Sequence, residues 1–322
     1  MTEGRPPTAG SAPLWERDAE IATVAQALDV LCADQTSAGS LLVLRGEAGL
    51  GKTALLAETR RIAERRGCAV WSARGAETLR SVPFHVVRQL LQPALLSLLP
   101  EEAREYLGDW YDIAGPALGI ADPQEGSADP QYVCDGLVAA VRRLARREWP
   151  LVLLLDDAHW SDQETLRWLA AFVERLDDVS VLVVVTRRPG EVSGDGARLL
   201  DTVAEAAGRS VSNLSALTPD ATAGLTRATL GRHADDAFCR EVWAVTGGNP
   251  YDTVELLAKV QDSELPRSRH RPGNCARSTA RPAAADSSTG SRDSGWRRPG
   301  SPGPPPSSAP ASPSTWSPAS PP

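Results

Sequence analysis

The segment GEAGLGKT, from Gly46 to Thr53, has the residue types and spacing to bind a phosphate chain. It fits the pattern GxxxxGK[ST], in which glycines let the backbone curl until successive N–H groups point at phosphate oxygens. In such a loop Lys52 reaches the β- and γ-phosphates, and the Thr53 hydroxyl is a magnesium ligand. We therefore predict a site for ATP, or a similar nucleoside triphosphate, with Mg²⁺. The expected nucleotide-binding residues are Gly46, Glu47, Ala48, Gly49, Leu50, Gly51, Lys52, Thr53 and Ala54.

Two adjacent acids, Asp156 and Asp157, follow a second apolar run, LVLLL. A buried strand that ends in a carboxylate can place it opposite the threonine of the phosphate-binding loop. We expect Asp156 to complete the magnesium site and Asp157 to act as a general base on the attacking water. Two acids after a strand could also cap a helix or face solvent. The phosphate-binding pattern earlier in the chain favours the metal site.

A third polar group, Thr186-Arg187-Arg188, follows the next apolar run. A cation on the strand expected between the two motif strands could sense the γ-phosphate, so Arg187 joins Lys52 and Asp157 as a catalytic candidate. The alternative is that both arginines cover the sheet edge or pair with surface acids. His159 and Trp160, just after the acids, could contact the triphosphate or serve packing.

These residues need a sheet to bring them together. Short apolar runs predict strands, and apolar positions at helical spacing between them predict helices. Strands that alternate with helices indicate a parallel sheet covered on both faces, hence an α/β fold. We expect a capping box of Ser161 and Glu164 before one helix, and Thr218 and Asn249 as N-caps of two later ones. The expected strands are residues 41–45, 68–72, 151–155, 179–185 and 210–214, and the main expected helices are residues 83–99, 133–147, 219–230, 235–246 and 250–260.

The composition and the expected elements divide the chain into four parts: a disordered N-terminus (1–13), an α/β domain with the phosphate-binding pattern (14–216), a small helical appendix (217–261) and a disordered tail (262–322). The tail holds 13 of the 26 prolines and 8 arginines against 4 acids, so it is basic. The rest of the chain is therefore more acidic than the net charge of −7 and is a poor general DNA binder. The tail's Pro/Ser/Arg composition is typical of disorder.

The cysteines and the hydropathy point to a cytoplasmic protein. The five cysteines are widely scattered and have no CxxC spacing, which predicts neither zinc nor a disulfide framework. No signal peptide and no run of 18 apolar residues occurs, so we expect no membrane segment.

Five segments together resemble a known family: WERDAEIATVAQAL, GEAGLGKTALL, LVLLLDDAHWSDQETLRWL, VVVTRRP and TGGNPYDTVELL. They are similar to the AAA-type ATPase module of large bacterial LuxR-type transcriptional regulators, signal-transducing ATPases of the STAND class. DDAHWSD and TGGNP are the more specific parts of the resemblance, which spans residues 14–260. Such modules also resemble the AAA domain of origin-recognition proteins.

The resemblance implies an ASCE-type, five-stranded parallel sheet with a small helical lid, and a slow ATPase that switches between ADP- and ATP-bound states. It places Lys52 and Thr53 on phosphates and magnesium, Asp156 on magnesium and Asp157 on water. Pro250, with its neighbours Gly248 and Asn249, would contact the nucleotide from the lid. Family members usually have Gly-Arg-Glu where this chain has Glu16-Arg17-Asp18, in the segment that packs by the base.

The sequence after residue 260 departs from the family, whose members continue into sensor repeats and a DNA-reading helix-turn-helix. The tail resembles that of a truncated product with no DNA-binding domain, and a tail read out of frame is one hypothesis for it. The leading function is an ATP-binding switch with slow hydrolysis. Its partners would be ATP or ADP, and a protein partner or a second copy bound through the ATPase domain. The alternatives are a non-hydrolysing interaction module or inert remnant and, less favoured, a DNA-associated initiator ATPase.

Overall fold

Five parallel strands form one sheet in the computed structural model, which describes residues 14–122, 129–231 and 234–262. The order is β2-β3-β4-β1-β5, which confirms the predicted five-stranded α/β fold. Apart from Asp262, the expected disordered termini lie outside the described residues. The strands are β1 (Ser40–Arg45), β2 (Ala69–Arg74), β3 (Leu151–Asp156), β4 (Val181–Arg187) and β5 (Val211–Asn213).

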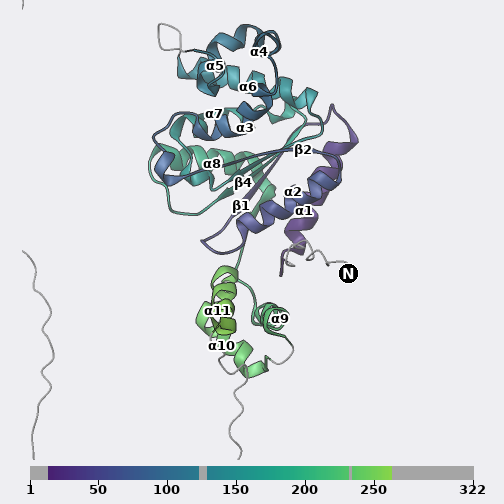
Figure 1. Cartoon of the computed structure of the whole chain (residues 1–322), viewed down its shortest axis with the longest axis vertical. Coiled ribbons are helices and arrows are strands. Elements are labelled where there is room, and N and C mark those ends of the chain that lie inside the picture. The colour runs from purple at the N-terminus through teal and green to yellow at the C-terminus, as the bar shows by residue number, and fades with distance from the viewer. Residues whose placement is uncertain (1–13, 123–128, 232–233, 263–322) are drawn as a thin grey trace, which may run out of the picture. The chain divides into compact units, whose positions relative to one another are not determined.

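The central strands β3 and β4 are apolar on both faces because helices cover both sides of the sheet (Figure 1). Successive side chains of a strand point to opposite faces. In β3, Leu153 and Leu155 therefore join one hydrophobic cluster, and Val152 and Leu154 join another. Each buried Leu or Val contributes about 1.5–3 kcal/mol of transfer free energy. The same alternation decides where the polar residues at the strand ends point.

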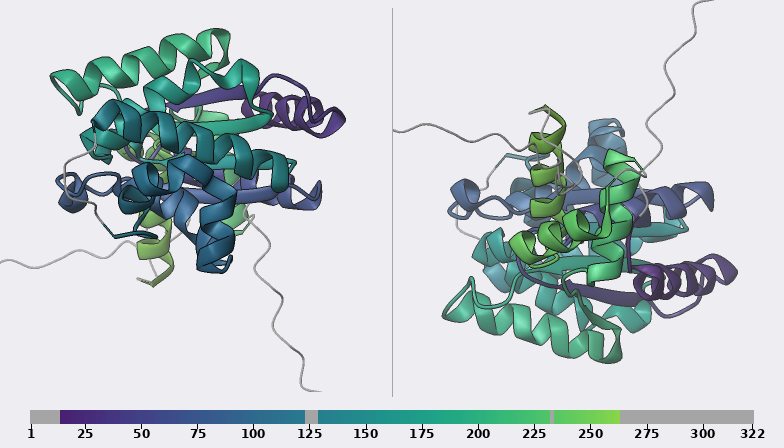
Figure 2. Two further views of the ribbon diagram at one scale, coloured as in Figure 1. Left: turned by 90° about the horizontal axis from the view of Figure 1, so that it is seen from above. Right: turned by 90° about the horizontal axis from the view of Figure 1, so that it is seen from below.

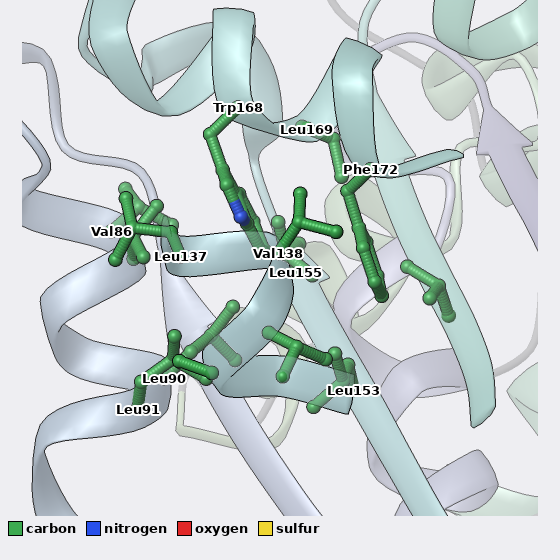
Figure 3. Packing of buried hydrophobic residues seen from close by; sticks show 14 of the residues in the cluster. Val86, Leu90, Leu91, Leu137, Val138, Leu153, Leu155, Trp168, Leu169 and Phe172 are labelled. Carbon is green, nitrogen blue, oxygen red and sulfur yellow. The ribbon is translucent and has the colours of Figure 1, made fainter. Parts of the chain in front are cut away.

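Helices α1 (Asp18–Ala33) and α2 (Lys52–Arg65) cover one face of the sheet. The opposite face carries α3 (His85–Leu96), α6 (Pro130–Arg147), α7 (Gln163–Val173) and α8 (Asp195–Ala207). Figure 3 shows Trp168 and Phe172 of α7 among the leucines and valines of α3, α6 and β3 in this cluster. Two shorter helices, α4 (Pro100–Leu107) and α5 (Tyr111–Leu118), pack beside α6.

Three helices follow β5 and form a group of their own: α9 (Pro219–Leu230), α10 (Asp236–Thr246) and α11 (Pro250–Asp262) (Figure 2). Their shared core is small, with Leu230, Val242, Leu257 and Val260 buried. Thr218 caps α9 as predicted, because its hydroxyl accepts the N–H of Ala221. Asn249 Oδ1 accepts the N–H of Tyr251 at the start of α11.

Several helices differ from the sequence-based expectation. The capping box of Ser161 and Glu164 is wrong, because α7 is capped by Asp162, whose carboxylate accepts the N–H of Thr165 at 2.8 Å. Four further helices, α1, α4, α5 and α8, were not predicted. In α8 only Leu200 and Val203 are buried, which leaves a weak helical pattern in the sequence. Among the described residues, no helix is both long enough and apolar enough to cross a membrane.

Candidate functional site

The loop of residues 46–53, which we call the P-loop, joins β1 to the first turn of α2. Gly49 and Gly51 have φ of +79° and +89°, a left-handed conformation that glycine adopts without steric cost. The helix that follows directs its N-terminal N–H groups toward the loop, an arrangement that favours anions. The loop therefore has the backbone form that a phosphate chain requires.

Lys52 is buried at the first position of α2, and its Nζ donates to the carbonyl oxygens of Gly46, at 2.8 Å, and Glu47, at 2.7 Å. Burial lowers the pKa of Lys52, and the nearby Arg188 guanidinium lowers it further, while Asp157 and Asp156 raise it. An amine held among carbonyl oxygens beside a second cation is poised to gain from an incoming anion.

Thr53, Asp156 and Thr186 converge from three different elements. The Thr53 hydroxyl donates to Asp156 Oδ2 at 2.9 Å, and the Thr186 hydroxyl donates to Asp156 Oδ1 at 2.7 Å. The convergence follows from strand alternation, which turns Asp156 and Thr186 toward the α2 side of the sheet. A hydroxyl and a carboxylate at this spacing are the oxygen ligands that Mg²⁺ prefers, so Thr53 and Asp156 fit a magnesium ion.

Asp157 has a left-handed backbone, with φ of +49°, and its side chain is buried. Its carboxylate is held by Arg74 at the end of β2, whose Nη2 lies 2.8 Å from Oδ2. Its N–H donates to the Thr186 hydroxyl at 2.8 Å. The candidate general base therefore lies beside Asp156, but a cation that the sequence analysis did not single out already occupies one of its oxygens.

The placement of Arg187 favours the alternative reading, in which it pairs with an acid. β4 continues through this residue, and alternation sends its side chain to the face covered by α8. There its guanidinium contacts the Leu200 carbonyl and lies 2.8 Å from Asp201. The structure thus brings Lys52, Thr53, Asp156 and Asp157 together but does not bring Arg187 with them.

Arg188 and His159 are nearer to the site than Arg187. Glu191 lies between them, with Oε1 at 2.7 Å from Arg188 Nη1 and Oε2 at 3.1 Å from His159 Nε2. His159 is fully buried, and its Nε2 is 4.0 Å from Asp157 Oδ1. Burial lowers the pKa of His159, although both carboxylates raise it. Sequence reasoning named His159 and Arg188 but missed Glu191, whose acidic side chain three residues after Arg188 was the available signal.

The segment before α11 contacts the P-loop directly. Asn249 Nδ2 donates to the Ala48 carbonyl at 3.0 Å, and the Tyr251 N–H donates to the Gly49 carbonyl at 3.2 Å. A Cβ on Gly49 would lie 2.4 Å from Asn249 Oδ1, so the approach requires glycine at that position. Pro250 lies between these two contacts as the first residue of α11.

The N-terminal segment also reaches the P-loop. Arg17 is buried and donates to the carbonyls of Leu50, at 3.1 Å, and Ser215, at 2.7 Å. Glu16 has φ of +53°, a conformation that suits the glycine usual in the resembled family, and its carboxylate accepts the Thr218 N–H at 2.9 Å. The departure at Glu16 is thus compensated by a helix-capping contact.

A pocket of about 340 Å³ opens beside Thr53 and Asp156 and is lined also by Arg60, Ser72, Arg74 and Gln89. A larger pocket of about 450 Å³ lies at the N-terminal ends of β1 and β4, at the other edge of the sheet from the P-loop. Ser37 and Ser180, which precede these two strands, are part of its lining. The smaller pocket is the one that belongs to the site, because it adjoins the residues with phosphate- and metal-binding chemistry.

Comparisons with known proteins agree with this geometry. Residues 13–185 match the family model described as an AAA ATPase domain. No curated protein sequence matches the chain. The structure is similar to that of Cdc6p from Pyrobaculum aerophilum, with a TM-score of 0.51 and 14% identity over 81% of this chain and 65% of that one. At this identity the likeness shows the fold alone.

Two further solved structures are similar. One is the ORC1 protein of Aeropyrum pernix in complex with DNA, with a TM-score of 0.49 and 18% identity over 80% of this chain and 63% of that one. The other is a Signal Transduction ATPase with Numerous Domains (STAND) protein with a tetratricopeptide repeat sensor from Pyrococcus horikoshii. Its TM-score is 0.42, with 16% identity over 76% of this chain and 30% of that one. The chain spans less than two thirds of each of these structures.

Proposed function

The chain belongs to the AAA ATPase domain family, and on that premise we propose that it is a magnesium-dependent ATP-binding switch module that hydrolyses ATP slowly. We assign residues 14–216 to the ATPase domain and 217–261 to its lid. ATP and Mg²⁺ are the proposed cofactors. The proposed partner is another protein, or a second copy of this chain, bound through the ATPase domain. The proposed location is the cytoplasm.

The observation that carries this proposal is the convergence of Lys52, Thr53 and Asp156 at the ends of β1 and β3. A buried amine, a hydroxyl and a carboxylate meet at the N-terminus of α2, where the backbone N–H groups favour phosphate. The pattern GxxxxGK[ST] predicted this site, and the strand before it and helix after it are those the motif requires.

Each residue has a role in the proposed reaction. Lys52 would leave the two carbonyl oxygens it now contacts and pair with the β- and γ-phosphates. Thr53 and Asp156 would hold magnesium, which when bound supplies positive charge beside the phosphates. Asp157 would accept a proton from the attacking water, provided Arg74 releases its Oδ2 atom. Asn249 and Pro250 would close the site from the lid.

The proposed biological setting is signal transduction, as in the ATPase module of LuxR-type regulators. The support is the resemblance of five segments of the chain to that module, including DDAHWSD and TGGNP. A shared fold by itself hosts many activities, so this assignment rests on the segments and on the site rather than on the sheet.

A second candidate is a module that binds ATP without hydrolysing it. The contact between Arg74 and Asp157 favours this candidate, because the guanidinium occupies a carboxylate oxygen that the attacking water would need. The two candidates share the nucleotide site and differ only in whether Asp157 becomes free.

Phosphate release in a single turnover tests the proposal. Native chain in excess over Mg-ATP should release phosphate slowly. Asp157→Asn should bind the nucleotide but release phosphate about 10²- to 10⁴-fold more slowly, since it lacks the base. Asp177→Asn, at an acid far from the P-loop in sequence, is the matched control and should behave as native. Tight ATP binding with no release from the native chain would reject slow hydrolysis and favour the second candidate.

A further inference from the structure

Glu191, in the loop between β4 and α8, holds two side chains at once. Oε1 pairs with Arg188 at 2.7 Å, and Oε2 faces the buried His159 ring at 3.1 Å. Glu191 itself is about one third exposed, with 31% of its side-chain surface accessible. Its two carboxylate oxygens thus contact two different side chains, one of which, His159, is fully buried.

The backbone of Arg188, the arginine that pairs with Glu191, lies next to the P-loop. The Arg187 carbonyl accepts the N–H of Gly46 at 3.3 Å, and the Gly46 carbonyl in turn accepts Lys52 Nζ at 2.8 Å. Arg188 follows directly, as the first residue after β4. Its Nε atom is buried and has no hydrogen-bond partner among the residues that the structure describes.

Arg188 and Lys52 repel each other, which is why Arg188 lowers the pKa of Lys52. Two cations close together favour a polyanion between them. Lys52 is the first to meet a bound phosphate chain, because it lies inside the P-loop. A terminal phosphate adds charge, part of which Lys52 and magnesium would neutralise, and an Arg188 released from Glu191 would neutralise more of it.

We propose that Glu191 sets the discrimination between nucleoside triphosphate and diphosphate by competing with the terminal phosphate for Arg188. This inference rests on the proposed nucleotide-binding function. ATP must displace Glu191 to gain Arg188, whereas ADP leaves the pair intact. When ATP has displaced it from Arg188, Glu191 keeps its contact with His159. His159 Nε2 is 4.0 Å from Asp157 Oδ1, so the displacement changes the charges beside the general base.

The test measures equilibrium binding of fluorescent ATP and ADP analogues with Mg²⁺ to the full chain. Glu191→Gln keeps the size of the side chain but removes the charge, so ATP should bind about two- to fivefold more tightly, the range of a partly exposed ion pair. ADP binding should stay the same. In an Arg188→Ala background, Glu191→Gln should change neither affinity, because there is no cation left to release.

A matched control is Glu164→Gln, since Glu164 has the same 31% side-chain exposure and also pairs with an arginine three residues away, Arg167. It should leave the ATP/ADP affinity ratio unchanged. An unchanged ratio in Glu191→Gln, or an effect that persists without Arg188, would overturn the inference. If the native chain and Lys52→Ala bind ATP equally, the proposed function itself fails, which is a separate outcome.

Discussion

Arg74 Nη2 lies 2.8 Å from Asp157 Oδ2 and joins the ends of neighbouring strands β2 and β3. Nε of the same guanidinium is 3.1 Å from that oxygen and 3.8 Å from Asp156 Oδ2. The positive charge of Arg74 thus lies beside both acids. Its guanidinium also occupies one carboxylate oxygen of the candidate base, so that this oxygen is not available to the attacking water.

Replacing Arg74 by Gln should therefore speed phosphate release rather than slow it. An exposed ion pair of this kind is worth up to about 1 kcal/mol, so the rate should rise by up to about fivefold. Arg60→Gln is the matched control, because Arg60 lines the same pocket but contacts Ser72 and Glu64 instead of Asp157. A single-turnover assay distinguishes them. A rate as low as that of Asp157→Asn would mean that Arg74 assists the reaction.

The lid contact predicts a role for Asn249 in nucleotide affinity. Asn249→Asp keeps the acceptor that caps α11 but loses the donor to the Ala48 carbonyl and adds a negative charge near the phosphates. One lost hydrogen bond corresponds to about two- to tenfold weaker ATP binding. Gln261→Ala, which loses an amide contact to Thr229 within the lid, should bind as native. An ATP affinity of Asn249→Asp equal to that of the native chain would mean that the lid contact does not contribute to nucleotide binding.

The buried imidazole of His159 predicts acid sensitivity. Burial lowers the pKa of His159 below 6.5, so the unfolded chain takes up a proton first as the pH falls. The unfolded state then binds more protons, and the free energy of unfolding drops by up to about 1.4 kcal/mol per pH unit below 6.5. Urea unfolding at several pH values checks this. His159→Gln should show a shallower dependence over that window; an equal slope would contradict the assignment.

Cys32 and Cys68 lie with their Sγ atoms 3.5 Å apart. An added diazene oxidant that takes one hydrogen from each thiol should join them, with a small shift of both side chains toward bonding distance. Burial raises the pKa of Cys68 to about 12, so the thiolate is scarce and the reaction should be faster at pH 9 than at pH 7. Peptide mapping should find the linked pair, and Cys32→Ser should lack it. Modification without a crosslink would refute this prediction.

The parts of the site that could be predicted from the sequence are local. Lys52, Thr53 and Asp156 follow apolar runs whose length and composition indicate buried strands, and parallel strands bring their carboxyl ends to one edge. Cys32 and Cys68 were read as scattered because nothing in their spacing shows that α1 lies beside the start of β2. The Arg74 contact with Asp157 likewise depends on which strands are neighbours.

The sequence left Arg187 between a contact with the γ-phosphate and a pair with an acid, for a different reason. The sequence placed the end of β4 at residue 185, whereas the strand continues to Arg187. A residue inside a strand must point to one face of the sheet, whereas a residue in a loop can turn either way. Because Arg187 lies inside β4, its side chain is held on the α8 face, where it contacts Asp201. A boundary of this kind depends on pairing with β1, which extends to Arg45.

The P-loop should bind ATP together with magnesium. Lys52 and Lys259 are the two lysines of the chain, which gives a matched pair of variants. Equilibrium titration with a fluorescent ATP analogue and Mg²⁺ should show binding to the native chain and to Lys259→Ala, and at least about tenfold weaker binding to Lys52→Ala, since a charged contact to phosphate is lost. Equal affinity in all three proteins would contradict the account.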